Sequence, residues 1–172
     1  MAKPRSPRTP AGNSHIHARP LEAADFKFVQ NLAAKQPTFT VPSAYLLWLL
    51  LRIDGAICLM AEHSTKGPLA YLLALPAKDP KRSMFVWQFA SSGGRERETA
   101  SLALLTAFRG VVARLGVESI IFSSVPNSAA YRAVRRYAWK VFSSVPKAMS
   151  SLPPIVNPSE REFMLLLKTT GT

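Results

Sequence analysis

Residues 85–95 have the sequence FVWQFASSGGR, and this stretch decides the fold. Its first half is an apolar and aromatic run of strand length, and it ends in a polar turn with two glycines. Residues 96–116 then place apolar side chains at the spacing of an amphipathic helix. A strand, a tight turn and a helix in this order point the free backbone N–H groups of the helix towards the space beyond the strand. That geometry suits a phosphate, although the turn matches neither the dinucleotide fingerprint nor the Walker P-loop.

The rest of the chain divides into short elements bounded by proline, glycine and serine. Strands are predicted at residues 17–21, 56–62, 69–75, 84–91, 118–125 and 162–168, the second and third forming a hairpin. Helices are predicted from residue 23 or 24 to Pro37, from 42 to 51 or 52, from 96 to 116, and from 126 to about 140, with a connection at residues 143–159. This β-α-α-β-β-β-α-β-α-β order predicts an α/β (α+β) fold with one mixed, mostly antiparallel sheet and helices on both faces.

The composition indicates one folded domain with a basic surface. The 172 residues carry a formal net charge of +12, and we expect a disordered basic tail at residues 1–15 before a single domain at residues 16–170. The charge favours nucleic acid, anionic lipid or a polyphosphate ligand, and it disfavours a polycationic substrate. Cys58, the one cysteine, stands in an apolar run and is predicted to be an inert thiol, which favours a cytoplasmic location. No apolar run approaches the ~20 residues of a membrane span, so no membrane association is expected.

Four short segments carry a resemblance to a known family. They are HARP at residues 17–20, AYLL at 44–47, FVWQ at 85–88 and NSAA at 127–130. In their order and spacing they resemble the GNAT acetyltransferase superfamily and, within it, the diaminobutyrate acetyltransferases of ectoine synthesis. The resemblance covers residues 17–142 and extends to residue 168, so it includes every predicted element.

The resemblance implies that acetyl-CoA binds where the fourth and fifth predicted strands diverge, near Ser91 and Val125, and that an amine attacks the thioester directly. It implies catalytic roles for Phe89, through its backbone N–H, and for Asn127. The coenzyme would be held by residues around the turn, namely Phe89, Ser91, Gly94, Arg95, Arg97, Thr99 and Asn127. Tyr45 and Trp87 would shape the pocket for a small-molecule amine, with a diamino acid such as diaminobutyrate as the candidate. No metal is implied.

The predicted phosphate-binding turn departs from the pattern of that superfamily. Where the superfamily has Arg or Gln, then Gly, then Gly or Ala, this chain has Gly94, Arg97 and Thr99. The missing central glycine removes a place where phosphate approaches bare backbone, and the Arg97 guanidinium would compensate as a charged donor. Glu96 and Glu98 would oppose a phosphate, although carboxylates in a first helical turn also stabilise the helix dipole.

Several features leave a second functional class open. Arg132, Arg135, Arg136 and Lys140 form a basic stripe on one face of the last predicted helix. The stripe is either a solvated face or a surface for nucleic acid or a protein partner on a catalytically silent protein of the same fold. Glu62 is either a general base or a surface carboxylate, and pairing of two copies into a homodimer is left open.

Overall fold

The computed structural model describes residues 15–78, 82–124, 129–148 and 163–169. The strands are β1 (Ile16–Pro20), β2 (Ile57–His63), β3 (Gly67–Ala77), β4 (Ser83–Ser91), β5 (Ser119–Ser124), β6 (Lys147–Ala148) and β7 (Phe163–Lys168). They form one seven-stranded sheet in the order β1-β2-β3-β4-β5-β7-β6. Only the β4–β5 pair is parallel, and the other pairs are antiparallel. The predicted mixed, mostly antiparallel sheet is therefore confirmed.

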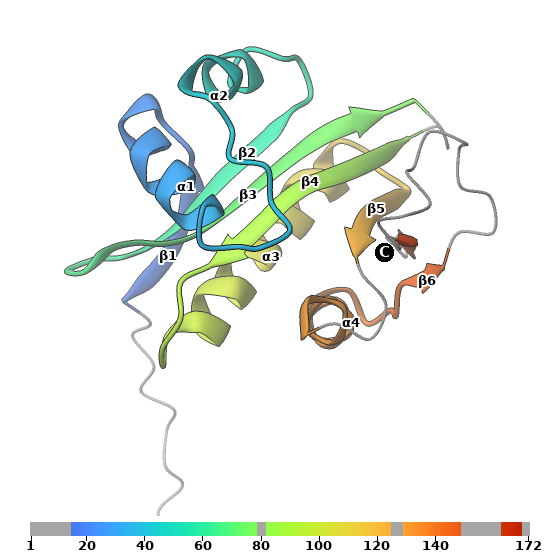
Figure 1. Ribbon diagram of the computed structural model, residues 1–172. Coiled ribbons are helices and arrows are strands. Elements are labelled where there is room, and N and C mark those ends of the chain that lie inside the picture. Colours follow the sequence, from blue (N-terminus) through green and yellow to red (C-terminus); the bar gives the residue numbers. More distant parts are fainter. Residues whose placement is uncertain (1–14, 79–81, 125–128, 149–162, 170–172) are drawn as a thin grey trace, which may run out of the picture.

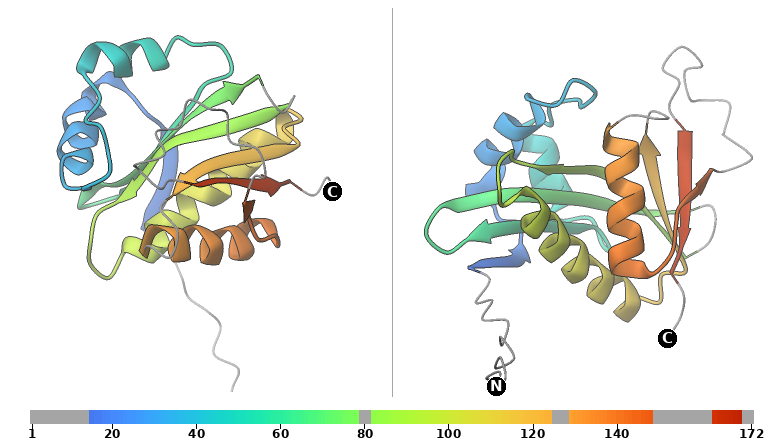
Figure 2. Two further views of the ribbon diagram at one scale, coloured as in Figure 1. Left: turned by 45° about the vertical axis from the view of Figure 1, so that its right-hand side comes forward. Right: turned by 90° about the horizontal axis from the view of Figure 1, so that it is seen from below.

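Helices cover both faces of this sheet (Figures 1 and 2). They are the 3₁₀ turn η1 (Ala23–Asp25), α1 (Phe26–Ala33), α2 (Ala44–Leu50), α3 (Arg97–Arg114) and α4 (Ala129–Phe142). The helices α1 and α2 pack on one face around Val29, Leu47 and Tyr71. The helices α3 and α4 pack on the other face, where Phe108 and Tyr137 are buried with residues of all the central strands. This arrangement confirms the predicted helices on both faces.

Local sequence signals explain most element boundaries. The hydroxyl of Ser43 accepts a hydrogen bond from the Leu46 N–H at 3.1 Å, so it caps α2. Gly116 adopts a φ of 65° just after α3, as expected of a glycine that ends a helix. One element was missed, because β6 lies inside residues 143–159, which were predicted as a connection. Its two residues pair with Leu166 and Leu165 of β7 and are too few to show a strand pattern.

Two other predictions concern residues that the structure does not describe. Residues 1–14 of the predicted tail and residue 170 at the end of the predicted domain lie outside the described residues. Within the described residues, no helix is long and apolar enough to cross a membrane.

Candidate active site

The parallel pair β4–β5 separates part of the way along its length. The two strands pair from Ser83↔Ser119 to Val86↔Phe122, and the described register contains no β4–β5 pair beyond that point. The strand β4 nevertheless continues to Ser91 and stays paired with β3. The strands therefore diverge from Trp87 onwards, earlier than the predicted position near Ser91 and Val125. Of these two positions, Val125 lies outside the described residues.

A β-bulge coincides with this divergence. Leu73 of β3 faces Gln88 and the next residue, Ala74, faces Val86, so Trp87 has no counterpart on β3. A bulge bends its strand and increases the local twist, which explains why β4 turns away from β5 at this residue. Alternate backbone N–H and C=O groups of residues 87–91 are then directed to the side that β5 has left, where an extended ligand can pair with them as an added strand.

The bulge also places two consecutive side chains on the side of the sheet that α1 and α2 cover. Trp87 is half-buried against the core under these helices. Gln88 is buried, and its amide accepts a hydrogen bond from the Tyr71 hydroxyl at 2.9 Å and donates one to the Thr40 carbonyl at 2.7 Å. Burial raises the pKa of Tyr71, so its phenol stays protonated and remains a donor. The network ties the α1–α2 connection to β4 at the divergence, and it joins residues too far apart in the sequence to be predicted from it.

On the opposite face, Phe89 lines an apolar hollow under the divergence. The hollow is a shallow recess of about 240 Å³ when the open solvent above it is included, and it is lined by Phe89, Leu105, Phe122, Val134, Ala138 and Phe142. These residues come from β4, α3, β5 and α4, so the hollow lies where the separating strands meet both helices. An apolar recess beside unpaired strand backbone is suited to a chain that is apolar along its length and carries amide groups.

The turn after β4 is held in place by β3. The backbone N–H and the hydroxyl of Ser92 both donate to the Leu69 carbonyl, at 2.7 and 2.6 Å. Gly94 has a φ of 100°, a conformation that favours glycine, and its carbonyl accepts from the Arg97 N–H at 3.3 Å. Four of the predicted phosphate-binding residues, Gly94, Arg95, Arg97 and Thr99, are exposed here, while Ser91 is half-buried at the end of β4. The structure thus gathers them at one end of β4.

The two glutamates of this turn each have a lysine partner from elsewhere in the chain. Lys66, in the β2–β3 turn, pairs with Glu96, and the His63 imidazole lies 3.8 Å from the same carboxylate. Lys140 of α4 pairs with Glu98 at 2.5 Å. The hydrogen bond from each lysine is the main cause that lowers the pKa of each carboxyl. The carboxylates expected to oppose a phosphate are therefore already compensated, by lysines 30 and 42 residues away.

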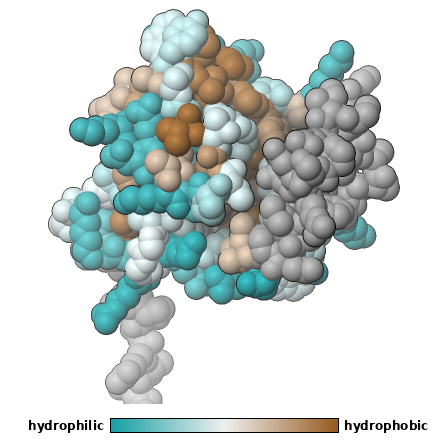
Figure 3. Space-filling view, viewed as in Figure 1, coloured by the Kyte–Doolittle hydropathy of each residue, from teal (hydrophilic) through white to brown (hydrophobic). Residues whose placement is uncertain are grey.

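Tyr45 and Trp87 lie in different surroundings. The Tyr45 side chain is 69% exposed and stacks on Trp48 with ring centroids 6.0 Å apart, and it lies outside the core cluster that holds Trp87. Apolar side chains gather over α2 in Figure 3, and the exposed ones there include Val41, Leu46 and Ile53. Asn127 lies outside the described residues.

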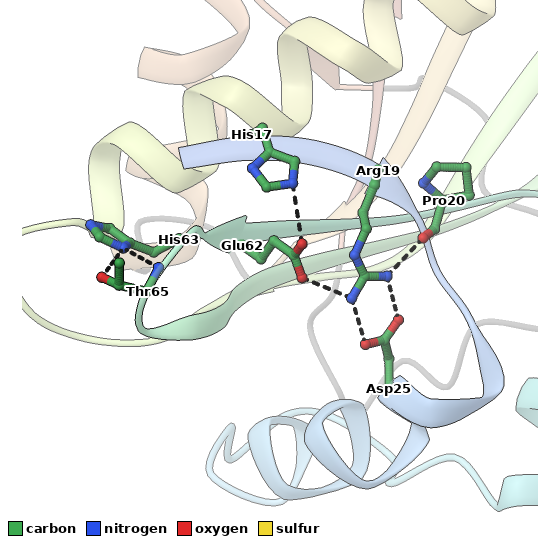
Figure 4. Close-up of polar contacts among 7 residues, drawn as sticks. All are labelled: His17, Arg19, Pro20, Asp25, Glu62, His63 and Thr65. Carbon is green, nitrogen blue, oxygen red and sulfur yellow. Dashed lines mark hydrogen bonds and ion pairs between the residues drawn. The ribbon is translucent and has the colours of Figure 1, made fainter. Parts of the chain in front are cut away.

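Glu62 belongs to an ion-pair network rather than standing free (Figure 4). Its carboxylate lies 2.9 Å from the Arg19 guanidinium and 3.1 Å from the His17 imidazole. Arg19 also pairs with Asp25 at 2.7 Å, and the Asp25 carboxylate is almost fully buried. The hydrogen bond from Arg19 is the main cause that lowers the pKa of Glu62, which makes this carboxylate a weak base. The network joins β1, β2 and η1, and it favours the structural interpretation of Glu62.

The remaining reactive side chains offer little chemistry. Burial raises the pKa of the Cys58 thiol to about 11, so the nucleophilic thiolate is scarce at neutral pH. Among the residues that the structure describes, no group of three or more His, Cys, Asp or Glu side chains could hold a metal ion.

No protein-family model matches the chain, and no curated protein sequence matches it either. Solved structures do match. A diaminobutyrate acetyltransferase from Paenibacillus lautus, in complex with L-2,4-diaminobutyric acid and coenzyme A, is similar with a TM-score of 0.70 and 22% identity, over 90% of this chain and 95% of that one. Ard1 from Thermoplasma volcanium is similar with a TM-score of 0.71 and 15% identity, over 90% of this chain and 98% of that one.

A spermidine N-acetyltransferase from Vibrio cholerae is similar with a TM-score of 0.68 and 14% identity, over 91% of this chain and 95% of that one. At these identities the likeness establishes the fold and not the reaction. The chain has the mixed α/β fold of the GNAT acetyltransferases.

Proposed function

We propose that this protein transfers the acetyl group of acetyl-CoA to the amine of a small molecule. The observation that carries the proposal is the separation of β4 from β5 at the Trp87 bulge, above an apolar hollow and next to the turn that opens α3. The gap between the separated strands, called the slot below, accommodates the extended arm of the coenzyme. The thioester then lies close to the bulge. The fold supports the proposal, since two of the similar solved structures are named as acetyltransferases, and one of these is a complex with coenzyme A.

The reaction needs little beyond positioning. The amine nitrogen attacks the thioester carbonyl carbon, the new C–N bond forms as the C–S bond breaks, and the thiolate leaves with coenzyme A. The backbone N–H of Phe89 polarises the carbonyl oxygen, and Asn127 orients the arm near the sulfur. Water in the slot takes the proton that the amine releases, and water returns a proton to the thiolate as it leaves. Alignment of two bound reactants lowers such a barrier by roughly 7–11 kcal/mol.

The phosphates of the coenzyme bind at the turn between β4 and α3. Gly94 and the first N–H groups of α3 supply backbone donors, and Arg95, Arg97 and Thr99 supply side-chain donors. Because Glu96 and Glu98 are paired with lysines, they do not cancel the charge of these arginines. Ser91, at the end of β4, provides backbone N–H and C=O groups that pair with the arm of the coenzyme in the slot.

The acceptor is a small amine, and we propose a diamino acid such as diaminobutyrate, bound in a pocket that Trp87 helps to form. The net charge of +12 disfavours attraction of a polyamine and is compatible with an amine that also carries a carboxylate. Gln88 and Thr40 are joined by a hydrogen bond on the α1–α2 side of the bulge, where Trp87 is half-buried.

The experiment has two stages. Acetyl-CoA should raise the melting temperature by an amount that grows with the logarithm of its concentration, about 2.7 kcal/mol of stabilisation at 100 times Kd. Arg97→Gln should shrink this shift, whereas Arg114→Gln, at the other end of the same helix and equally exposed, should leave it unchanged. Release of free coenzyme A thiol is then measured across a panel of amines. No thermal shift at millimolar acetyl-CoA would refute the proposal.

A further inference from the structure

The outer face of α4 combines positive charge with an exposed aromatic ring. The fourteen residues of α4 include four basic side chains and no acidic one. Arg132, Arg135, Arg136 and Lys140 are exposed, and their spacing places them on one side of the helix. Trp139 lies in the middle of this set by the same spacing, and 60% of its surface is exposed. We call these five residues the basic–aromatic face.

Packing of α4 does not require Trp139. The inner side of the helix buries Tyr137, Ala138, Val141 and Phe142 in the core, and Val134 lines the hollow. The Trp139 indole therefore adds little to the core, and it presents an aromatic face beside cations on which a flat ligand can stack. The basic–aromatic face and the hollow use opposite sides of α4, so a ligand on the former leaves the slot for the coenzyme open.

The cations of this face are partly ordered by neighbouring rings. The Arg135 guanidinium lies 5.6 Å from the centre of the Tyr131 ring, and the Arg136 guanidinium lies 5.0 Å from the centre of the Tyr137 ring. Arg136 also donates a hydrogen bond to the Tyr137 hydroxyl at 3.2 Å. Lys140 is paired with Glu98, and no carboxylate among the described residues pairs with Arg135 or Arg136. The two guanidiniums therefore keep their charge and have little freedom to lose on binding.

We propose that the basic–aromatic face binds single-stranded nucleic acid. An exposed indole between guanidiniums matches a base that stacks on the ring while the neighbouring phosphates contact Arg135 and Arg136. The net charge of +12 attracts such a polymer over longer distances. A duplex fits less well, because its bases are stacked on each other and cannot use Trp139. A membrane surface also fits less well, because Trp139 is the only large apolar side chain among the exposed residues of α4, and Ala129 and Ala130 give nothing to insert.

The first test measures binding of the full chain to a fluorescent single-stranded RNA of about 12 nucleotides, within the ~4–16 that one binding fold covers. Trp139→Ala should weaken binding about 5- to 150-fold, which is the loss expected when one stacked base is released. Trp139→Phe, which keeps a stacking ring, should restore most of the affinity. Trp48→Ala is the matched control, since Trp48 is also exposed but lies on α2, where the Arg52 guanidinium covers its ring at 3.8 Å.

The second test measures the salt dependence of binding. Neutralising Arg135 and Arg136 to Gln should reduce the slope of log affinity against log salt by about 0.7 for each lost phosphate contact. Lys27→Gln, an exposed cation on the opposite face of the sheet, should leave the slope unchanged. Equal affinity of Trp139→Ala and the wild type would overturn the proposal. So would equally tight binding of duplex, or retention on phosphatidylserine vesicles without binding to RNA. Acetyl transfer is assayed separately, so either proposal can fail alone.

Discussion

Removing one oxygen atom from the buried network at the bulge should destabilise the protein measurably. In Tyr71→Phe the ring stays, but the Gln88 amide oxygen loses its donor at 2.9 Å. Tyr71 is 0% exposed and Gln88 is 3% exposed, so water does not replace the lost hydroxyl. A buried polar group left without a partner costs about 1–3 kcal/mol. For a domain of this size that corresponds to a fall of roughly 2–12 °C in melting temperature.

The assay is urea unfolding at neutral pH, with the midpoint compared at unchanged m-value. Tyr45→Phe is the matched control, because its hydroxyl belongs to a side chain that is 69% exposed and its loss should stay within about 0.5 kcal/mol. Combining Tyr71→Phe with Gln88→Met should cost less than the sum of the single changes, with a coupling of about 0.5–3 kcal/mol. Additive costs, or a loss for Tyr71→Phe no larger than the control's, would show that the hydroxyl does not hold Gln88.

The same substitution has a functional consequence if the proposed acceptor side is right. Gln88 also donates to the Thr40 carbonyl, so the α1–α2 connection should become less well fixed when Gln88 loses Tyr71. The KM for the amine should rise, while the thermal shift caused by acetyl-CoA should stay the same. A change in the thermal shift caused by acetyl-CoA, without a change in the KM for the amine, would contradict the placement of the amine on the α1–α2 side of β4.

Three further outcomes follow from single positions. Gly94→Ala should destabilise by about 1–2 kcal/mol in urea unfolding, because φ is 100° there, whereas Gly93→Ala, with equally open surroundings and no such φ, should cost little. Ala138→Leu should fill the hollow and abolish the thermal shift with acetyl-CoA, while Ala113→Leu on the exposed side of α3 should preserve it. Arg19 lowers the pKa of the Asp25 carboxyl in the folded protein. The stability that this pair contributes is therefore present above the pKa of about 4 in the unfolded chain, and it is lost as the pH falls through the lower pKa of the folded state. Asp25→Asn should therefore destabilise at pH 7 and converge with the wild type in unfolding experiments at more acidic pH.

The sequence was sufficient to predict the fold because its strongest signals are local. The apolar run at residues 85–91, the two glycines and the long helix with one apolar face define a β-α-β unit, and the remaining strands are short apolar runs bounded by turn residues. The short β6 could not be predicted, because Lys147 and Ala148 owe their strand geometry to pairing with β7. Elements with a signal in their own sequence were predicted. The strand β6, which depends on pairing with β7, was not.

The candidate site was predictable in its backbone and not in its side-chain pairing. The turn around Gly94 follows from the order of elements, and the divergence of two strands was implied by the resemblance to the GNAT superfamily. The bulge at Trp87 carries no glycine and sits within a run that is apolar except for Gln88, so its position could not be predicted from the sequence. The partnerships of Lys66 with Glu96 and of Lys140 with Glu98 join residues 30 and 42 positions apart, and only the folded chain brings them together.

These two pairs change the meaning of the unusual turn. Along the chain, residues 95–98 alternate arginine and glutamate, and their formal charges cancel. In the folded protein the glutamates are satisfied by lysines from the β2–β3 turn and from α4, and no carboxylate among the described residues pairs with Arg95 or Arg97. Positive charge is therefore left at the N-terminus of α3, where the helix dipole adds to it. A turn without a central glycine for close backbone approach can therefore still attract anions, through the side chains of Arg95 and Arg97.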